Sequence, residues 1–245
     1  GRPLSVDLTL RPGTVVVVTV GGAGMSPAQL EREYLRWGGS RKRPEERIGR
    51  YGQGGKAAIG HLGNRLRMLV SPEGDPHAYV FEDDRYRDRA RLRTYELREA
   101  RKPVDPALGY VRIEIGDVDK RLDAGRASTR LAETYRPLLL DGMLDILVNR
   151  APVLPREISL VERHEFRVRG GGRLVSGWYG LLPDPPPAGI EPGIRVHHLG
   201  RRIGDPVWFG ETPATHPALN RLVGELEAPH VPVTMNKSDV DHNSP

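Results

Sequence analysis

Cysteine is absent from this 245-residue sequence. Its absence excludes disulfide bonds, thiolate nucleophiles, iron–sulfur clusters and cysteine-ligated zinc. Long apolar runs are also missing, because no stretch approaches the roughly 18 to 20 apolar residues that a membrane-spanning helix requires. No signal or transit peptide is recognisable, and the chain begins at Gly1 rather than at Met. We therefore expect a cytoplasmic protein without membrane contact, and a start at Gly1 is compatible with a fragment.

Lysine is scarce among the basic residues, and the excess of positive charge is small. The chain has 37 Lys and Arg against 32 Asp and Glu, which gives a net charge of +5. Nucleic-acid modules usually concentrate more charge than this on one face. An ammonium group is a compact point charge that differs from a guanidinium at a crowded phosphate, so the positions that keep lysine are informative. They are Lys42, Lys56, Lys102, Lys120 and Lys237.

Hydrophobic patterning predicts an α+β chain. The β-branched run Val15–Val20 predicts a strand buried on both faces, and Ser26 with Pro27 predicts the start of a helix over Ala28–Trp37. Further helices are expected over Lys56–Leu62 and Ser128–Leu140, and a helix running into a strand over Pro217–Leu226. Further strands are expected at Ser5–Leu10, Arg65–Val70, Ala78–Phe81, Tyr110–Ile115, Asp145–Asn149, Glu165–Val168, Leu174–Leu181, Gly193–His198 and Val231–Met235. This order implies two α+β layers in sequence, each with a mixed or antiparallel sheet.

The strongest local motif is the glycine-rich run Ile48–Lys56, which leads into a helix of small residues. Glycine leaves backbone amides free to surround an anion, and the following helix N-terminus adds positive dipole. Lys56 could reach the same phosphates. The spacing is not that of an ordinary P-loop, because Arg50 stands where that motif needs glycine and Ala57 where it needs Ser or Thr. A flexible loop with helix-packing glycines is the alternative.

Three further motifs accompany this run in the order of the chain. Gly21–Met25 follows the predicted buried strand, Trp37–Lys42 places a hydroxyl and an ammonium in a glycine loop, and Pro232–Asp239 lies near the end. A strand–glycine–helix junction alone is common and is more often structural than functional. The lysines Lys42, Lys56 and Lys237 all fall inside these motifs.

Taken together, the four motifs resemble those of the GHKL ATPase superfamily, which includes gyrase B, heat-shock-90-type chaperones, MutL and histidine kinases. The resemblance is greatest to bacterial MORC-like members and covers nearly the whole chain. It implies a partial Bergerat-type ATP-binding α/β sandwich over residues 1–118, a connecting helix and strand region over 119–157, and a transducer-like (ribosomal S5 domain 2-like) α/β domain over 158–245. It also implies ATP and Mg²⁺ as cofactors, a homodimer, and a DNA or protein client.

The resemblance also assigns roles to individual residues. In the family, the glycine-rich segment forms a lid that holds the nucleotide phosphates. A lysine from the second domain, here Lys237, reaches the γ-phosphate as the catalytic residue. The implied nucleotide-binding residues are Gly22, Gly24, Met25, Ser40, Lys42, Gly49, Arg50, Tyr51, Gly52, Gln53, Gly54, Gly55 and Lys56.

The sequence departs from the family pattern at three places. Val20 stands where the family has the Asp that binds the adenine amino group, Gly21 replaces the neighbouring Asn, and Gly109-Tyr110 replaces Gly-Thr. The helix with the water-activating Glu and the Mg²⁺-binding Asn would precede Ser5. Either the chain is truncated, or it is a degenerate member that keeps the fold without hydrolysis. Three functions remain open. In order of preference they are an ATP-gated switch, a non-enzymatic scaffold and a protein that binds nucleic acid directly.

Other candidate residues point to structural roles. His164, His197, His198, His216 and His230 show no ligand spacing with carboxylates, so a metal site is not expected. The charged segment Arg85–Arg101 is typical of a solvated surface. Trp178, Trp208 and Phe209 are expected to pack in a core or between domains.

Overall fold

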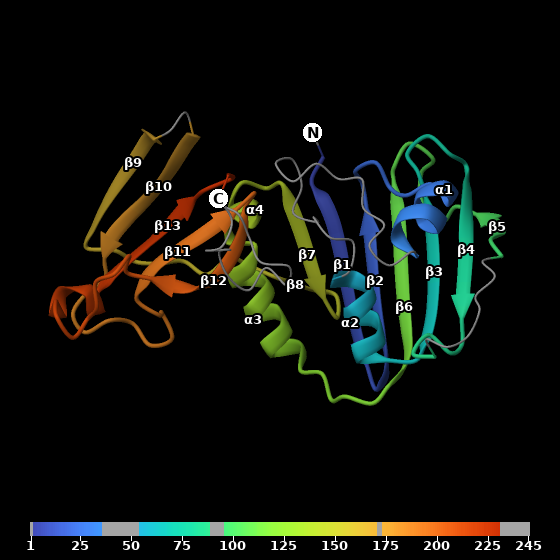
Figure 1. Cartoon of the computed structure of the whole chain (residues 1–245), viewed down its shortest axis with the longest axis horizontal. Helices are drawn as coiled ribbons and strands as arrows, with labels where there is room; N and C mark the ends of the chain where they lie inside the picture. Colours follow the sequence, from blue (N-terminus) through green and yellow to red (C-terminus); the bar gives the residue numbers. More distant parts are fainter. Residues whose placement is uncertain (1, 36–53, 89–95, 171–172, 231–245) are drawn as a thin grey trace. The chain divides into compact units, whose positions relative to one another are not determined.

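The computed structural model describes residues 2–35, 54–88, 96–170 and 173–230. The described residues form two compact units, which comprise 2–35, 54–88, 96–132 and 138–154 in unit 1 and 133–137, 155–170 and 173–230 in unit 2. Each unit is built on its own sheet (Figure 1). None of the helices in the described part of the chain has the length and apolar character needed to cross a membrane.

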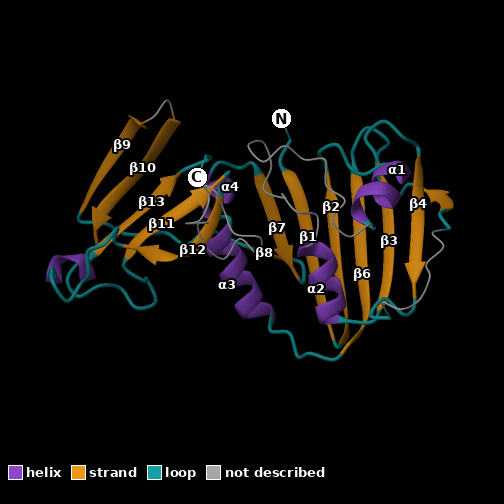
Figure 2. Cartoon of the chain, in the orientation of Figure 1, coloured by secondary structure: helices purple, strands orange, loops and turns teal. Residues whose placement is uncertain are grey.

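Unit 1 contains an eight-stranded mixed sheet (Figure 2). Its strands in spatial order are β5 (Arg98–Arg101), β4 (His77–Asp83), β3 (Arg65–Ser71), β6 (Tyr110–Val118), β2 (Gly13–Val20), β1 (Leu4–Arg11), β7 (Leu144–Val148) and β8 (Ala151–Pro152). The β1–β7 pair is parallel, and every other neighbouring pair is antiparallel. β7 and β8 come from the segment that the sequence suggests as a connection.

One face of this sheet carries the core of unit 1. Strand alternation places Leu8, Val17, Ile113 and Met68 at neighbouring positions of four strands, and the core cluster includes them. This face is covered by α1 (Pro27–Gln29), the π-helical turn η1 (Leu30–Tyr34) and α2 (Gly54–Leu62) (Figure 1). α3 (Ala124–Thr134) and α4 (Arg136–Leu140) follow β6 in the chain.

Unit 2 contains a five-stranded mixed sheet. Its strands in spatial order are β12 (Arg201–Val207), β11 (Gly193–His198), β13 (Leu222–Glu227), β10 (Arg173–Leu181) and β9 (Glu162–Gly170). β11 and β13 are parallel, whereas β9 with β10 and β11 with β12 are antiparallel hairpins. The short 3₁₀ turn η2 (Pro217–Asn220) leads into β13. A small apolar cluster gathers around Trp178, Leu182 and Val223.

Most predicted elements within the described residues are confirmed, with two corrections. The described part of the predicted helix Ala28–Trp37 is a short α-helix followed by a π turn, although Ser26 does cap it and Gln29 completes a capping box. The helix predicted over Ser128–Leu140 is divided in two at Tyr135, because Pro137 lacks the N–H that a continuous helix needs. The predicted strand Val231–Met235 lies outside the described residues.

Burial was predicted wrongly at two places. β2 is not buried on both faces, since Val15 alone of its eight residues is buried. On the opposite face Val16 and Val18 are only partly buried, and they lie beside Glu114 and Asp7 on the neighbouring strands. Phe209 is not a core residue, because it is 67% exposed in a turn with a φ of +53°.

Candidate functional site

The glycine-rich motif enters the described structure at the start of α2. Gly54 and Gly55 form its first turn, and both are exposed. A Cβ atom added to Gly54 would meet no atom within 4 Å, whereas one added to Gly55 would lie 3.0 Å from the Tyr34 hydroxyl. The first turn of α2 therefore has open space at Gly54 and a tight contact with η1 at Gly55.

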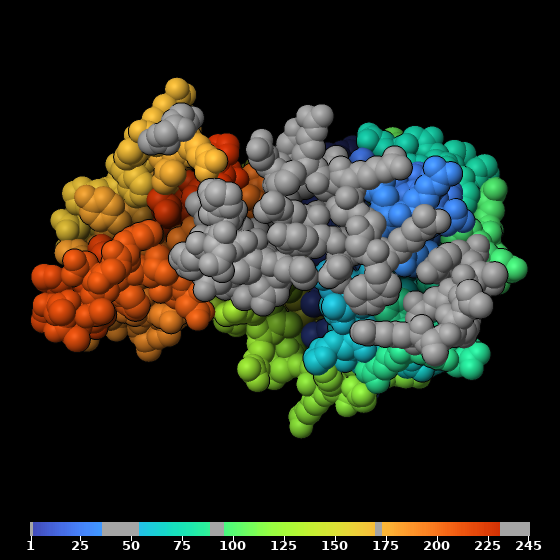
Figure 3. All heavy atoms as spheres, viewed as in Figure 1, coloured from blue at the N-terminus to red at the C-terminus, as the bar shows by residue number. Residues whose placement is uncertain are grey.

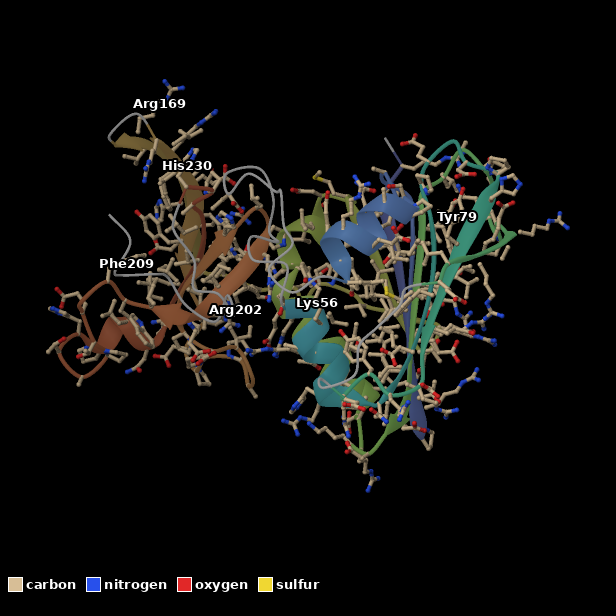
Figure 4. The ribbon with its side chains drawn as sticks, turned by 45° about the vertical axis from the view of Figure 1, so that its right-hand side comes forward. Lys56, Tyr79, Arg169, Arg202, Phe209 and His230 are labelled. Carbon is tan, nitrogen blue, oxygen red and sulfur yellow. The ribbon has the colours of Figure 1, made fainter. Side chains whose placement is uncertain are left out.

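Lys56 is buried at the start of α2 (Figure 4). Its side chain is only 2% exposed, its Nζ donates a hydrogen bond to the Glu33 carbonyl at 3.3 Å, and it lies 5.9 Å from the centroid of the Tyr34 ring. Burial lowers the pKa of Lys56, and it raises the pKa of Tyr34 to about 12, with a smaller contribution from Tyr86. In this arrangement the ammonium joins α2 to η1.

A buried lysine also occurs outside every motif. Lys102 is 5% exposed, and its Nζ donates to the carbonyls of Pro72, Asp75 and Pro106 at 2.8, 3.0 and 3.0 Å. These three bonds use all the donors of the ammonium. A lysine in this arginine-rich chain can therefore have a purely structural role. The presence of lysine at a position is by itself no sign of a phosphate contact.

The turn after β2 packs backbone against backbone. Gly24 has a φ of +65°, and a Cβ atom there would lie 2.1 Å from the Ser71 carbonyl oxygen and 2.8 Å from the Gly109 Cα. Gly21 N–H donates to the Gly109 carbonyl at 2.9 Å. Gly22 also has a positive φ, of +60°, and Met25 is partly buried against the core. Packing alone accounts for the glycine at position 24.

Several predicted residues lie outside the described part of the chain. They are Ser40, Lys42, Gly49, Arg50, Tyr51, Gly52, Gln53 and Lys237. Of the predicted nucleotide-binding set, the structure therefore describes two groups. One is the turn Gly22–Met25, and the other is the helix start Gly54–Lys56.

An apolar cavity of about 360 Å³ lies between the sheet of unit 1 and α2. Its walls include Leu8, Val17, Ile59 and Ile115, and Asp123 is the one carboxylate among its lining residues in the described structure. The Asp123 carboxylate already accepts the Arg126 N–H at 2.8 Å. Such walls suit an apolar group and offer nothing to a phosphate. The alternating apolar residues of β1 and β2 were the available signal, but alternation does not reveal which part of a face stays uncovered.

Unit 2 contains a buried ionic cluster that sequence reasoning missed. The Glu225 carboxylate on β13 accepts hydrogen bonds from Arg136 at 2.8 Å and from the Trp178 indole N–H at 3.0 Å. Arg195 and Arg202 are each 8% exposed. Burial lowers the pKa of Arg195, and the charge of Arg202 adds to this. Charged residues at alternate positions of the β11 and β13 patterns were the signal.

His197 lies in this cluster and provides a pH prediction. Burial lowers its pKa to about 4, with Arg202, Arg195 and Arg136 lowering it further and Glu225 opposing. The unfolded chain therefore binds a proton between about pH 6.5 and 4 that the native state does not, so stability falls as pH falls through this window. We expect a loss of about 3 kcal/mol from His197 between pH 7 and 4.

The prediction is tested by urea denaturation of the native chain and of His197→Gln at pH 7, 5.5 and 4. The variant stays neutral, so its stability should decline less steeply on acidification. Identical pH profiles for the two proteins would contradict it. His164→Gln is a matched control, because His164 is an exposed histidine on β9 of the same sheet.

Comparison with known proteins identifies similarity at the level of structure. No protein-family model and no curated protein matches the sequence. The ATPase region of Saccharomyces cerevisiae topoisomerase II matches with a TM-score of 0.60 and 11% identity, over 96% of this chain and 70% of that chain. The same region bound to ICRF-187 (dexrazoxane) matches with a TM-score of 0.60 and 11% identity, over 96% and 71% of the two chains.

These matches bear on the predicted fold class. At 11% identity the likeness establishes the fold alone, and it extends over 96% of the chain, so both sheets are included. The expected mixed α+β architecture with two sheets is confirmed. The chain therefore has the fold of the ATPase region of yeast topoisomerase II.

Proposed function

We propose that this chain is a nucleotide-binding GHKL-type ATPase domain that acts as an ATP-gated conformational switch. The observation that carries the proposal is the fold match over 96% of the chain, combined with a glycine-rich run that opens α2. In this proposal residues 1–118 bind ATP, 119–157 connect, and 158–245 bring Lys237 to the γ-phosphate. Phosphate contacts would then drive closure of the lid and dimerisation.

The described residues fit a phosphate group at the start of α2. Gly54 is exposed with open space at its Cα, and the free N–H groups of a helix's first turn attract anions. Lys56 lies within the same turn. To bind a phosphate, its Nζ must exchange the Glu33 carbonyl for a phosphate oxygen, and its low exposure makes this a local rearrangement. Bound ATP would supply the phosphate charge that favours the exchange.

The described residues do not fit a Mg²⁺ site. Among residues 2–35, 54–88, 96–170 and 173–230, no three His, Asp or Glu side chains lie together as metal ligands. Oxygen ligands are what this ion requires. We therefore derive no step through a metal ion, and hydrolysis by this chain is not part of the proposal.

Thermal unfolding with nucleotide tests the proposal. A non-hydrolysable ATP analogue with Mg²⁺, at about 100 times its Kd, stabilises the native state by about 2.7 kcal/mol. For a chain of this size that corresponds to an increase in Tm of about 5–10 °C. We expect Lys42→Ala and Lys56→Ala to abolish the increase, and Lys120→Ala, outside every motif, to retain it.

The comparison uses the difference in Tm with and without nucleotide for each protein, because Lys56→Ala also removes a buried contact and lowers the Tm of the free protein. A native chain without any increase at millimolar nucleotide would rule the switch out. Equal increases in all variants would instead place the nucleotide elsewhere.

A degenerate scaffold of the same fold is the second candidate. Two observations favour it. Close contact with Ser71 and Gly109 explains why position 24 is glycine without any ligand, and the Lys56 ammonium already has a partner in the Glu33 carbonyl. Val20 also lacks the carboxylate that would bind the adenine amino group. Under this alternative the glycine motifs persist for packing, and nucleotide leaves the Tm unchanged.

A further inference from the structure

The hairpin of β9 and β10 forms the outer edge of the unit 2 sheet. β9 has β10 as its one neighbour in that sheet, and seven of the eight residues Glu162–Arg169 are exposed. The hairpin projects beyond the rest of unit 2, with Arg169 near its far end (Figures 3 and 4). Both faces of this ribbon are therefore accessible near its tip.

Arginines are concentrated along this ribbon. Residues 162–173 contain four arginines, two glutamates and no lysine. Arg163 is already engaged, because it pairs with Glu165 at 3.2 Å and lies 4.7 Å from the Trp178 ring centroid. Arg167, Arg169 and Arg173 are exposed, and no carboxylate among the described residues pairs with them. Within the described part of the chain, three guanidinium groups without a carboxylate partner therefore lie near the far end of the hairpin.

The three arginines occupy both faces of the tip. Arg167 and Arg169 are two residues apart on β9 and share one face, while Arg173, opposite Gly170, belongs to the other face by strand alternation. Guanidinium groups bind phosphate oxygens through paired N–H donors, a geometry that ammonium groups lack. This arrangement offers several phosphates a contact on either side of the ribbon.

Aromatic residues pack across the two strands, on the face of the ribbon that also carries Arg173. His164 and Tyr179 are directly opposite each other and stack with ring centroids 5.1 Å apart, and Phe166 lies 6.3 Å from Tyr179. Cross-strand aromatic pairs of this kind stabilise a sheet. A braced ribbon presents its arginines with less conformational entropy to lose on binding.

We propose that the β9–β10 hairpin is a nucleic-acid-binding ribbon in which Arg167, Arg169 and Arg173 contact backbone phosphates. A two-stranded ribbon has the dimensions to enter a major groove, and unpaired arginines can also follow a single strand. Charged residues on an edge strand can also serve to prevent pairing with a strand of another chain. The three arginines lie together near the end of the hairpin, where few backbone groups are available for such pairing, so this role explains their position less well. The proposal does not depend on nucleotide binding.

The proposal is tested by fluorescence anisotropy on the full chain without ATP, with labelled oligonucleotides of about 20 nucleotides in single-stranded and in duplex form. Three phosphate contacts make affinity fall about 40-fold for a duplex, or about 20-fold for a single strand, between 50 and 200 mM salt. In the combined variant Arg167→Gln, Arg169→Gln, Arg173→Gln, we expect the slope of log affinity against log salt to become shallower by about 2 to 3. The oligonucleotide, single-stranded or duplex, whose salt dependence becomes shallower in this variant is the one that the hairpin binds.

The matched control removes three exposed arginines from unit 1, as Arg11→Gln, Arg101→Gln, Arg121→Gln. It lowers the net charge equally, so retained binding and an unchanged slope would assign the effect to the hairpin. The proposal is overturned if the hairpin variant binds both oligonucleotides like the native chain, or if the control loses as much. Tighter binding of poly-glutamate than of either oligonucleotide would overturn it as well.

Discussion

Gly24→Ala is expected to destabilise unit 1 by at least about 4 kcal/mol. The added methyl group would lie 2.1 Å from the Ser71 carbonyl oxygen, 2.8 Å from the Gly109 Cα and 3.0 Å from the Tyr110 nitrogen. All three are backbone atoms, so β3 and β6 would have to separate where they meet the turn. Strain of this kind belongs to the small class of substitutions with very large effects. Hydrogen exchange measures this effect, because the backbone amides of β3 and β6 should lose most of their protection against exchange.

Gly142→Ala separates this close contact from backbone strain. Gly142 has a φ of +62°, close to the +65° of Gly24, but a Cβ atom there would meet nothing within 4 Å. A left-handed alanine alone costs about 1–2 kcal/mol. If both variants lost the same stability, the close approach would have no energetic importance. The positive φ would then by itself account for the glycine at position 24.

Glu225→Ala is the second change with a large expected effect, a loss of about 3–5 kcal/mol in unit 2. The side chains of Arg136 and Glu225 are 13% and 9% exposed, and their atoms are 2.8 Å apart. Removal of the carboxylate leaves the buried Arg136 charge without this partner and takes one of three acidic neighbours from Arg195. It also removes the acceptor of the Trp178 indole. Hydrogen exchange of β11 and β13 amides and the tryptophan fluorescence spectrum report the change.

Glu165→Ala provides the surface comparison on the same sheet. Glu165 pairs with Arg163 at 3.2 Å, but the two side chains are 76% and 52% exposed. Water and salt screen such a pair, so its loss should cost less than about 1 kcal/mol. A Glu225 variant no less stable than the Glu165 variant would show that solvent reaches the cluster.

Local pattern was sufficient to predict most of the strands. β11 spans Gly193–His198 as predicted, and β1, β3, β6 and β7 differ from the predicted bounds by a few residues at most. These are strong alternating or β-branched runs, for which strand period dominates. The capping box at Ser26 was similarly readable, because a cap involves residues three positions apart. Pro137 divided a predicted helix because its effect depends on the register of the helix end.

The candidate site was readable only in part. The glycine motif and its lysine were visible as letters, and the structure adds that Gly54 is open whereas Lys56 is buried against Glu33 and Tyr34. Whether a motif residue faces a ligand or a neighbouring element is a question of packing, and a single sequence does not report packing. Phe209 illustrates the same limit, since its apolar side chain lies on the surface.

The sequence by itself determined the α+β class, the strand order along the chain and the position of the glycine-rich run, because these depend on residue type and on spacing between near neighbours. Tertiary structure alone decided why Gly24 must be glycine, where Lys56 points, and that Glu225 gathers Arg136 and Trp178. Each of these joins segments far apart in the chain. Their energies come from burial and close approach, which exist only once the sheets have formed.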